Sequence, residues 1–380
     1  MEQEKKLLMQ ALRSAVTEHT SQVPSDVDWK EFLRLVKFHN VEALVCSGLK
    51  GQQLPEDVRA SLQAAYHHAI FRDAQLEHIK NRLQTLLTEA QVPHIFLKGA
   101  VLKHHYPIPA LRTMTDLDIL VYTRDYKKID QVAQNLGGTR FAGDGNHRNF
   151  LFPGNVKVEF HPNLLHHATP VATAVNPGWQ YARQDSAGTA KLTEEGFYLS
   201  ILCHMAEHFV TSGIGVRFVL DVWVFHNLRG QPVDRSFVEA ELKRFGLLEF
   251  VQNIEQLSRV WFDGEPTTPE MEELGEYILT SGIHGTQSRE MLNALSMSGG
   301  RAGALWKKAF YPRQELEDRY PWAKGRSWLL PAAWVARAVR AVTKHGSNIK
   351  AWGKGTGDFT LYQIREQKEK LERFGIKREK

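Results

Sequence analysis

The chain has 380 residues, of which 42% are hydrophobic and 24% are charged, as is typical of a globular protein with two or three domains. It contains no run of about 18 apolar residues, so no membrane-spanning helix is expected. The charged first ten residues lack the apolar core of a signal peptide. Cys46 and Cys203 lack metal-ligand spacing. We therefore expect reduced, buried thiols in a cytoplasmic protein.

Basic residues are concentrated at the C-terminal end. Residues 301–380 hold 19 Lys or Arg and 8 Asp or Glu, a net charge of +11, whereas the whole chain carries +5. This asymmetry favours contact with an acidic partner, such as a nucleic acid, an anionic membrane surface or an acidic protein. A solvated basic tail would have the same composition.

Helix and strand patterns alternate in the first half of the chain. Residues 28–50 and 65–90 have helical periodicity, and Pro93 ends the second helix. Short apolar runs with Gly and Pro punctuation then predict a strand at 94–97, a helix at 100–106, a strand at 115–121, a helix at 126–138, and paired strands at 149–153 and 156–161. Residues 94–165 are thus predicted to form a small mixed α/β unit.

The second half has a helical pattern. Thr193 can cap a first helix, and Glu194 and Glu195 suit the positive N-terminal end of that helix. Helices are also predicted over 217–228 and 237–260, residues 262–326 look less regular, and a final helix is expected from Pro331 to Gly346.

Two aspartates interrupt the apolar strand at 115–121. Side chains two residues apart in a strand point to the same side. Asp116 and Asp118 therefore project together, while Leu117 and Ile119 pack on the other side. Like charges on one face repel, and a shared cation relieves the repulsion. Carboxylate oxygens suit Mg²⁺ or Mn²⁺.

The strand at 156–161 offers a third carboxylate. By the same alternation, Glu159 shares a face with Lys157 and His161. Three carboxylates from two strands can hold two metal ions for an in-line displacement at phosphorus. A D-x-D pair alone is a weak signal, because surface pairs on edge strands arise by chance.

Residues upstream of the aspartates suit phosphate binding. Lys98 and Gly99 lie between the first strand and a short helix. A glycine there lets the backbone approach a phosphate, and the helix N-terminus offers N–H donors. Arg112, four residues before the first aspartate, can bind a phosphate through two nitrogens.

In combination, these residues resemble the nucleotidyltransferases of the DNA polymerase β superfamily, and above all its branch of uncharacterised nucleotidyltransferases. The resemblance covers most of residues 70–340. Its motifs occur in order as "FLKG" (96–99), "RTMTDLDILV" (112–121), "HRNF" (147–150), "VEFHPNLL" (158–165), "LCHMAEHF" (202–209), "RFVLDVWVF" (217–225) and "YPWAKGRSWLLPAAWVAR" (320–337).

The resemblance implies Mg²⁺- or Mn²⁺-dependent transfer of a nucleoside monophosphate from an NTP, ATP being expected, to an unknown acceptor. Asp116, Asp118 and Glu159 would hold the metal, with Glu159 as a possible base. Lys98 and Gly99 would face the triphosphate. The wider superfamily has Gly or Ser after the glycine of this turn, whereas Ala follows Gly99 here. Phosphate binding would then depend on backbone N–H groups and basic side chains.

The same resemblance sets the expected architecture. The fold class would be α+β, with a polymerase β-like mixed sheet and flanking helices embedded in a mostly helical protein. The predicted regions are a helical N-terminal region (1–92), the nucleotidyltransferase α/β unit (93–190), a helical domain (191–300) and a basic helical C-terminal region (301–380). An inactive nucleotide- or metal-binding module of this fold is an alternative.

Histidines suggest further sites. His204, Glu207 and His208 fit H-x-x-E-H, the helix motif of one class of zinc hydrolases. No distinct third ligand is evident, so these histidines are better explained as lining the acceptor cleft or as hydrogen-bonded core residues. His161 is a further candidate for the acceptor site. His147 and Arg148 follow a glycine-containing loop, and either could bind phosphates or face solvent.

Two helices carry charges that need an explanation. Asp221 lies in an apolar helix with Arg217 one turn before it, which predicts a structural ion pair. In the last helix, Arg337, Arg340 and Lys344 lie on one side. That helix could lie on a membrane surface, although packing against the body of the protein is favoured.

Overall fold

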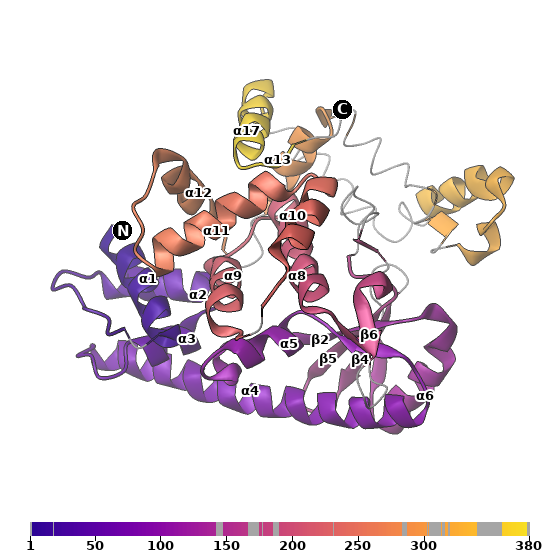
Figure 1. Cartoon of the computed structure of the whole chain (residues 1–380), viewed down its shortest axis with the longest axis horizontal. Coiled ribbons are helices and arrows are strands. Elements are labelled where there is room, and N and C mark those ends of the chain that lie inside the picture. Colours follow the sequence, from indigo (N-terminus) through magenta and orange to yellow (C-terminus); the bar gives the residue numbers. More distant parts are fainter. Residues whose placement is uncertain are drawn as a thin grey trace.

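The fold is described from a computed structural model. The described residues are 2–17, 19–141, 147–165, 175–176, 178–184, 190–230, 232–282, 287–301, 303, 313, 316–317, 320–339 and 359–377. Within them the chain forms an α+β fold, as predicted, in which a mixed sheet is embedded among helices (Figure 1).

The mixed sheet has five strands in the order β1-β2-β5-β4-β3. The strands are β1 (His94–Phe96), β2 (Asp116–Val121), β3 (Thr139–Phe141), β4 (Arg148–Phe152) and β5 (Val156–His161). Strands β2 and β5 are parallel neighbours, and the other pairs are antiparallel. A separate two-stranded ribbon consists of β6 (Ala182–Gln184) and β7 (Ala190–Leu192).

The two faces of the sheet have different chemistry. Helices α4 (Glu56–Glu89) and α6 (Tyr126–Asn135) pack on the apolar face, and Figure 1 shows α4 running along the molecule below the sheet. Leu117 of β2 and Phe160 of β5 are fully buried in this core. Because side chains alternate along a strand, the polar residues of β2 and β5 lie on the opposite face.

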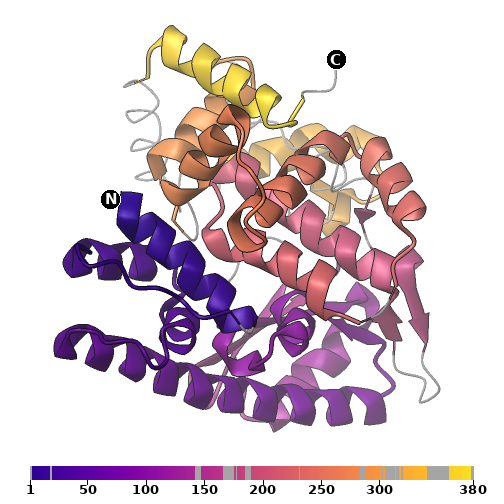
Figure 2. The same ribbon diagram turned by 60° about the vertical axis from the view of Figure 1, so that its left-hand side comes forward.

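A second, larger core joins helices from both ends of the chain. It contains residues of α1, α2, α3, the first half of α4, α8 to α12 and α17. The bounds are α1 (Glu2–Val16), α2 (Trp29–Phe38), α3 (Glu42–Gly48), α8 (Glu194–Thr211), α9 (Val216–Leu228), α10 (Arg235–Arg244), α11 (Leu248–Phe262), α12 (Pro269–Leu279), α13 (Gln287–Met297) and α17 (Leu361–Arg373). In Figure 2, the pink to yellow helices α8 to α12 and α17 lie above the sheet, and the indigo N-terminal helices lie to one side. The long helix α4 therefore contributes to both cores.

Two predicted helices are each divided in the structure, and two further helices were not predicted. The pattern at 28–50 forms two helices separated at Asn40, whose φ is 51°. The pattern at 237–260 likewise divides at Gly246, with a φ of 69°, because a left-handed residue ends a helix. Residues 262–326, predicted to be less regular, contain α12 and α13.

Other local predictions can be compared with the structure. Thr193 caps α8, since its side chain accepts a hydrogen bond from the Gly196 N–H. Cys203 is buried and Cys46 half-buried, and both are free thiols. In the described part of the chain, no helix has the length and apolar character needed to cross a membrane.

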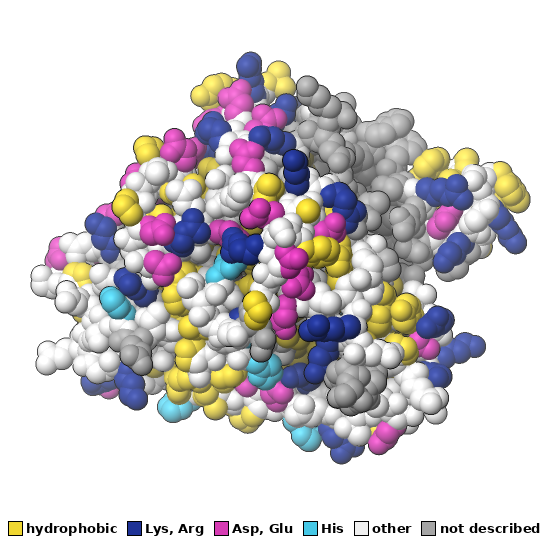
Figure 3. All heavy atoms as spheres, in the orientation of Figure 1, with side chains coloured by type: hydrophobic (Ala, Val, Ile, Leu, Met, Phe, Trp, Pro, Cys, Tyr) yellow, Lys and Arg dark blue, Asp and Glu magenta, His cyan; other side chains and the backbone are white. Residues whose placement is uncertain are grey.

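The basic C-terminal region is described only in part. A helix predicted from Pro331 to Gly346 is helical as far as Val339, and the rest lies outside the described residues. Figure 3 shows basic and apolar side chains together on the segment around residues 320–339, where Trp328 is 76% exposed. The contact with an acidic partner stays a prediction.

Candidate active site

Three carboxylates lie on one face of the two parallel strands. The strand register aligns Asp118 with Glu159 and Asp116 with Lys157, and aligned residues on neighbouring strands point to the same side of a sheet. Asp118 is buried, whereas Asp116 and Glu159 are half-buried. The alternation predicted from the sequence therefore brings the three acids together on the face opposite α4.

Two nitrogen-containing side chains contact the central carboxylate. The Lys98 ammonium donates a hydrogen bond to Asp118 Oδ1 at 3.0 Å, and His161 Nε2 lies 2.7 Å from the same oxygen and 3.6 Å from Glu159 Oε2. Lys98 has a φ of 49°, a left-handed conformation that strains a residue with a side chain. The strain directs a basic residue onto the acids at the site.

The electrostatics of the three acids differ. Burial alone would raise the pKa of Asp118, but Lys98 and His161 outweigh burial and hold it well below its ordinary value. Burial raises the pKa of Asp116, and repulsion by Asp118 adds to the rise. Burial also raises the pKa of Glu159, with further repulsion from both aspartates. Two of the acids therefore resist ionisation, which a bound cation would relieve.

The turn before the short helix α5 (Gly99–Leu102) is closed by its own hydrogen bonds. The Ala100 N–H donates to the Leu97 carbonyl, and the Val101 and Leu102 N–H groups donate to the Lys98 carbonyl. These three donors are thus already used within the turn. The side chain of Lys98 is consequently the charged group that the turn presents to the carboxylates.

Arg112, predicted to bind phosphate, joins the turn to the helical part of the protein. Its guanidinium donates two hydrogen bonds to Asp221 of α9, at 3.1 and 2.7 Å, and Tyr106 donates a third at 2.7 Å. A Cβ atom on Gly99 would lie 2.4 Å from Arg112 Nη1, so the glycine is needed for this close approach. The predicted ion pair between Arg217 and Asp221 is wrong: Asp221 pairs with Arg112, and Arg217 donates a hydrogen bond to the Thr113 carbonyl.

The first two residues of β4 point to opposite faces of the sheet. Arg148 aligns with Phe160 on the apolar face, where it stacks on Tyr126 and pairs with Asp130. The structure therefore does not bring Arg148 to the carboxylates. Asn149 aligns with Glu159, is buried, and its Oδ1 has no hydrogen-bond partner among the described side chains. Asn149 was not predicted as a site residue, although the two-residue period of a strand could have identified it.

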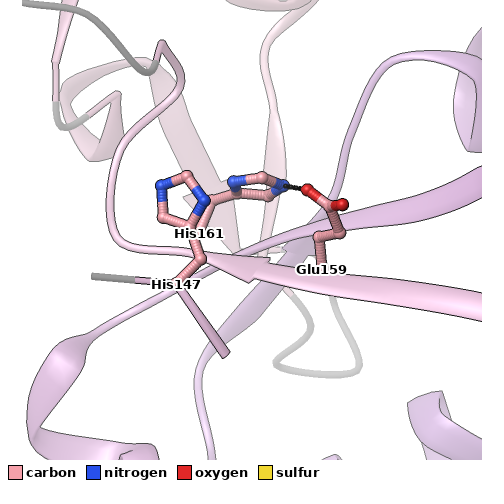
Figure 4. A group of neighbouring side chains, drawn as sticks. All are labelled: His147, Glu159 and His161. Carbon is pink, nitrogen blue, oxygen red and sulfur yellow. Dashed lines mark ion pairs between the residues drawn. The ribbon is translucent and has the colours of Figure 1, made fainter. Parts of the chain in front are cut away.

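His147, the residue just before β4, also reaches the site. Its ring lies 4.6 Å from the ring of His161, centroid to centroid. His147, Glu159 and His161 each offer a ligand atom within 4.8 Å of the others. Figure 4 shows the His161 ring between the other two side chains. His147 was predicted as a phosphate ligand and is found beside potential metal ligands.

A cavity of about 520 Å³ opens at the end of the sheet where β2 and β5 begin. It is lined by Thr115 and Lys157, which flank Asp116, and by the basic side chains of Arg72 and Arg112. The Arg72 guanidinium also donates to the carbonyls of Gly154 and Asn155. The cavity is within the size range of small-molecule sites.

Among the described residues, the H-x-x-E-H side chains do not gather into a group of metal ligands. His204 and His208 of α8 contact each other, with ring centroids 4.4 Å apart, and both contact Phe218. Across the described ranges, the group of metal-ligating side chains that comes together is His147, Glu159 and His161, not His204, Glu207 and His208. The zinc-hydrolase alternative therefore has no structural support, and the acceptor role of the α8 histidines stays a prediction.

One comparison with known proteins found a match. A family model described as "Uncharacterised nucleotidyltransferase" matches residues 25–263, which include the sheet, both cores in part and helices α8 to α11. No curated protein and no solved structure matches the chain. Since the family model covers more than half of the sequence, the chain belongs to this family of uncharacterised nucleotidyltransferases.

Proposed function

We propose that the protein transfers a nucleoside monophosphate from an NTP, ATP being the first candidate, to an acceptor and releases pyrophosphate. One observation carries the proposal: Asp116, Asp118 and Glu159 share one face of two parallel strands, and the pKa values of Asp116 and Glu159 are raised by burial, with repulsion among the acids adding to the rise. Such a cluster gains most from binding a cation and its phosphate ligand.

The donor set fits Mg²⁺ or Mn²⁺. Both ions prefer oxygen ligands and bind through a few carboxylates together with substrate phosphates. Asp116, Asp118 and Glu159 would supply these oxygens. Both contacts of Asp118 fall on Oδ1, so its Oδ2 is the oxygen best suited to a metal. When bound, the ion would supply Lewis-acid stabilisation of the charge that develops on the transferred phosphoryl group.

Each neighbouring residue has a role in this proposal. Lys98, held beside Asp118, would offset the negative charge of the triphosphate. Burial raises the pKa of Glu159, which suits a base that accepts a proton from the attacking group of the acceptor. The cavity lined by Arg72 and Lys157 is large enough for a nucleotide, and its basic side chains suit phosphate.

A specific observation also favours the second candidate, a binding module without turnover. Lys98 and His161 already contact Asp118, and Arg112 is engaged by Asp221. A nucleotide could then bind in the cavity while the acids fail to hold a catalytic cation. The two candidates agree on nucleotide binding and differ on chemistry.

The test separates binding from transfer. Calorimetry with Mg²⁺ and a non-hydrolysable ATP analogue measures binding. Incubation with α-³²P-labelled ATP and a fractionated cell extract measures transfer of label to an acceptor. Wild type and Glu89→Gln, an exposed control at the end of α4, should both bind and transfer, whereas Glu159→Gln should bind without transferring.

Each other outcome has a clear meaning. Binding without transfer in wild type would favour the module. If none of the four common NTPs binds, both candidate functions are overturned.

A further inference from the structure

The carboxylate face carries two imidazoles that an oxygen-only Mg²⁺ site does not need. His147 and His161 each offer a nitrogen within 4.8 Å of a Glu159 oxygen and of one another, and Figure 4 shows the three side chains converging. His161 is 2% exposed and Glu159 is 25% exposed. Two imidazoles and one carboxylate form a ligand set for borderline transition metals such as Zn²⁺.

The surroundings of His161 support the same assignment. Its Nε2 contacts Asp118 Oδ1 at 2.7 Å. The same Nε2 also faces Glu159, 3.6 Å from its Oε2, along the dashed line in Figure 4. Nε2 is therefore the nitrogen that an ion shared with Glu159 would contact, and Asp118 Oδ1 lies beside that position.

The distances require only a small closure. Ligand atoms in a tetrahedral zinc site lie roughly 3.3 Å apart, given bonds of about 2.0–2.1 Å. Because the three atoms here lie within 4.8 Å of one another, side-chain movements of at most about 1.5 Å would form the site. His147 precedes β4 and is half-buried, so its rotation does not disturb the sheet.

We propose that His147, Glu159 and His161 form a binding site for a zinc-type divalent ion, next to the carboxylate site for Mg²⁺ and sharing Glu159 with it. Binding at the new site is independent of nucleotide. Its effect on catalysis rests on the proposed function, because an ion held by Glu159 changes the group assigned as the base.

Cobalt is the probe for this site, because Co²⁺ bound by nitrogen and oxygen ligands in a low-coordinate site absorbs visible light strongly. Tag-free protein is titrated with Co²⁺ in the absence of nucleotide. We expect one equivalent to bind, to persist in a large excess of Mg²⁺ and to be displaced by Zn²⁺. His147→Ala removes a direct ligand and should weaken Co²⁺ binding by at least about 10-fold, because the loss of an outer partner alone has an effect of that size.

Matched variants make the result specific. His67→Ala removes an exposed histidine of α4 and should bind Co²⁺ as wild type does. Asp116→Asn changes the carboxylate site alone and should also bind Co²⁺. His147→Gln repeats the test if His147→Ala melts at a lower temperature than wild type.

The failures of the two proposals can be told apart. Absence of the Co²⁺ bands, equal bands in the His147 variants, or displacement of Co²⁺ by equimolar Mg²⁺ would each overturn the zinc-type site, whatever the transfer assay shows. Co²⁺ binding that depends on His147, in a protein that transfers no nucleotide with any metal, would leave the site standing and remove the proposed function.

Discussion

The two aspartates of β2 should respond in opposite ways to the same chemical change. In Asp118→Asn the Lys98 ammonium loses the carboxylate that it contacts at 3.0 Å. In Asp116→Asn the repulsion that contributes to the raised pKa of Asp116 disappears. We expect the first variant to be less stable than wild type in the absence of metal, and the second to be equally or more stable.

The magnitude follows from the geometry. Opposite charges 3.0 Å apart attract by about 5.5 kcal/mol at an effective dielectric constant of about 20. The net loss of folding stability in Asp118→Asn is smaller, about 2–4 kcal/mol, because a buried amide is less costly to desolvate than a carboxylate and because the remaining acids still attract Lys98. This loss lies near or below the range for broken buried pairs. Asp116→Asn should gain between zero and about 1 kcal/mol.

The dependence on pH has a defined sign. The pKa of Asp118 is lowered in the folded state, so its contribution is present above the unfolded pKa of about 3.9 and is lost as the pH falls towards the folded value. The pKa of Asp116 is raised, so its unfavourable contribution is absent at low pH and appears as the pH rises through the folded value. Both differences from wild type should therefore be largest near neutral pH.

Thermal melting in EDTA at pH 7 and at pH 4 measures these differences. For a chain of 380 residues, a loss of this size should lower the Tm of Asp118→Asn by roughly 2–5 °C at pH 7, and by less at pH 4. Adding Mg²⁺ should raise the Tm of wild type more than that of either variant. If both variants shift in the same direction by the same amount at pH 7, the two aspartates have equivalent environments and the reasoning is refuted.

Three further variants test the turn and its connection to α9. Arg112→Leu leaves Asp221 buried without its cation and should destabilise the protein by about 3–5 kcal/mol in urea unfolding; a fall below 1 kcal/mol would mean that the pair is not structural. Gly99→Ala puts a methyl group 2.4 Å from Arg112 Nη1 and should cost about 1–3 kcal/mol by the same assay, whereas an unchanged unfolding midpoint would contradict the close approach. Lys98→Ala should weaken Mg²⁺-NTP binding by about 10- to 150-fold in calorimetry, since a charge-assisted contact contributes about 1.5–3 kcal/mol; affinity equal to that of wild type would exclude a phosphate role for Lys98.

Local sequence rules determined much of the carboxylate face. The two-residue period of "DLDILV" and "VKVEFH" separates acids from apolar residues without any knowledge of the fold. It predicts that Asp116 and Asp118 share a face and that Glu159 shares one with His161. The strand register agrees with these predictions. The same period, applied to residues 147–149, would have distinguished Asn149 from Arg148.

Only the tertiary structure decided which charges meet. Asp221 lies 109 residues after Arg112, and its nearer candidate, Arg217, has a different partner. Lys98 contacts Asp118 because a left-handed backbone turns it inwards. Sequence periodicity describes one element at a time, and it fixes the face on which a side chain lies. The partner of a buried charge is set by the packing of elements far apart in the chain, where desolvation makes each unpaired charge costly.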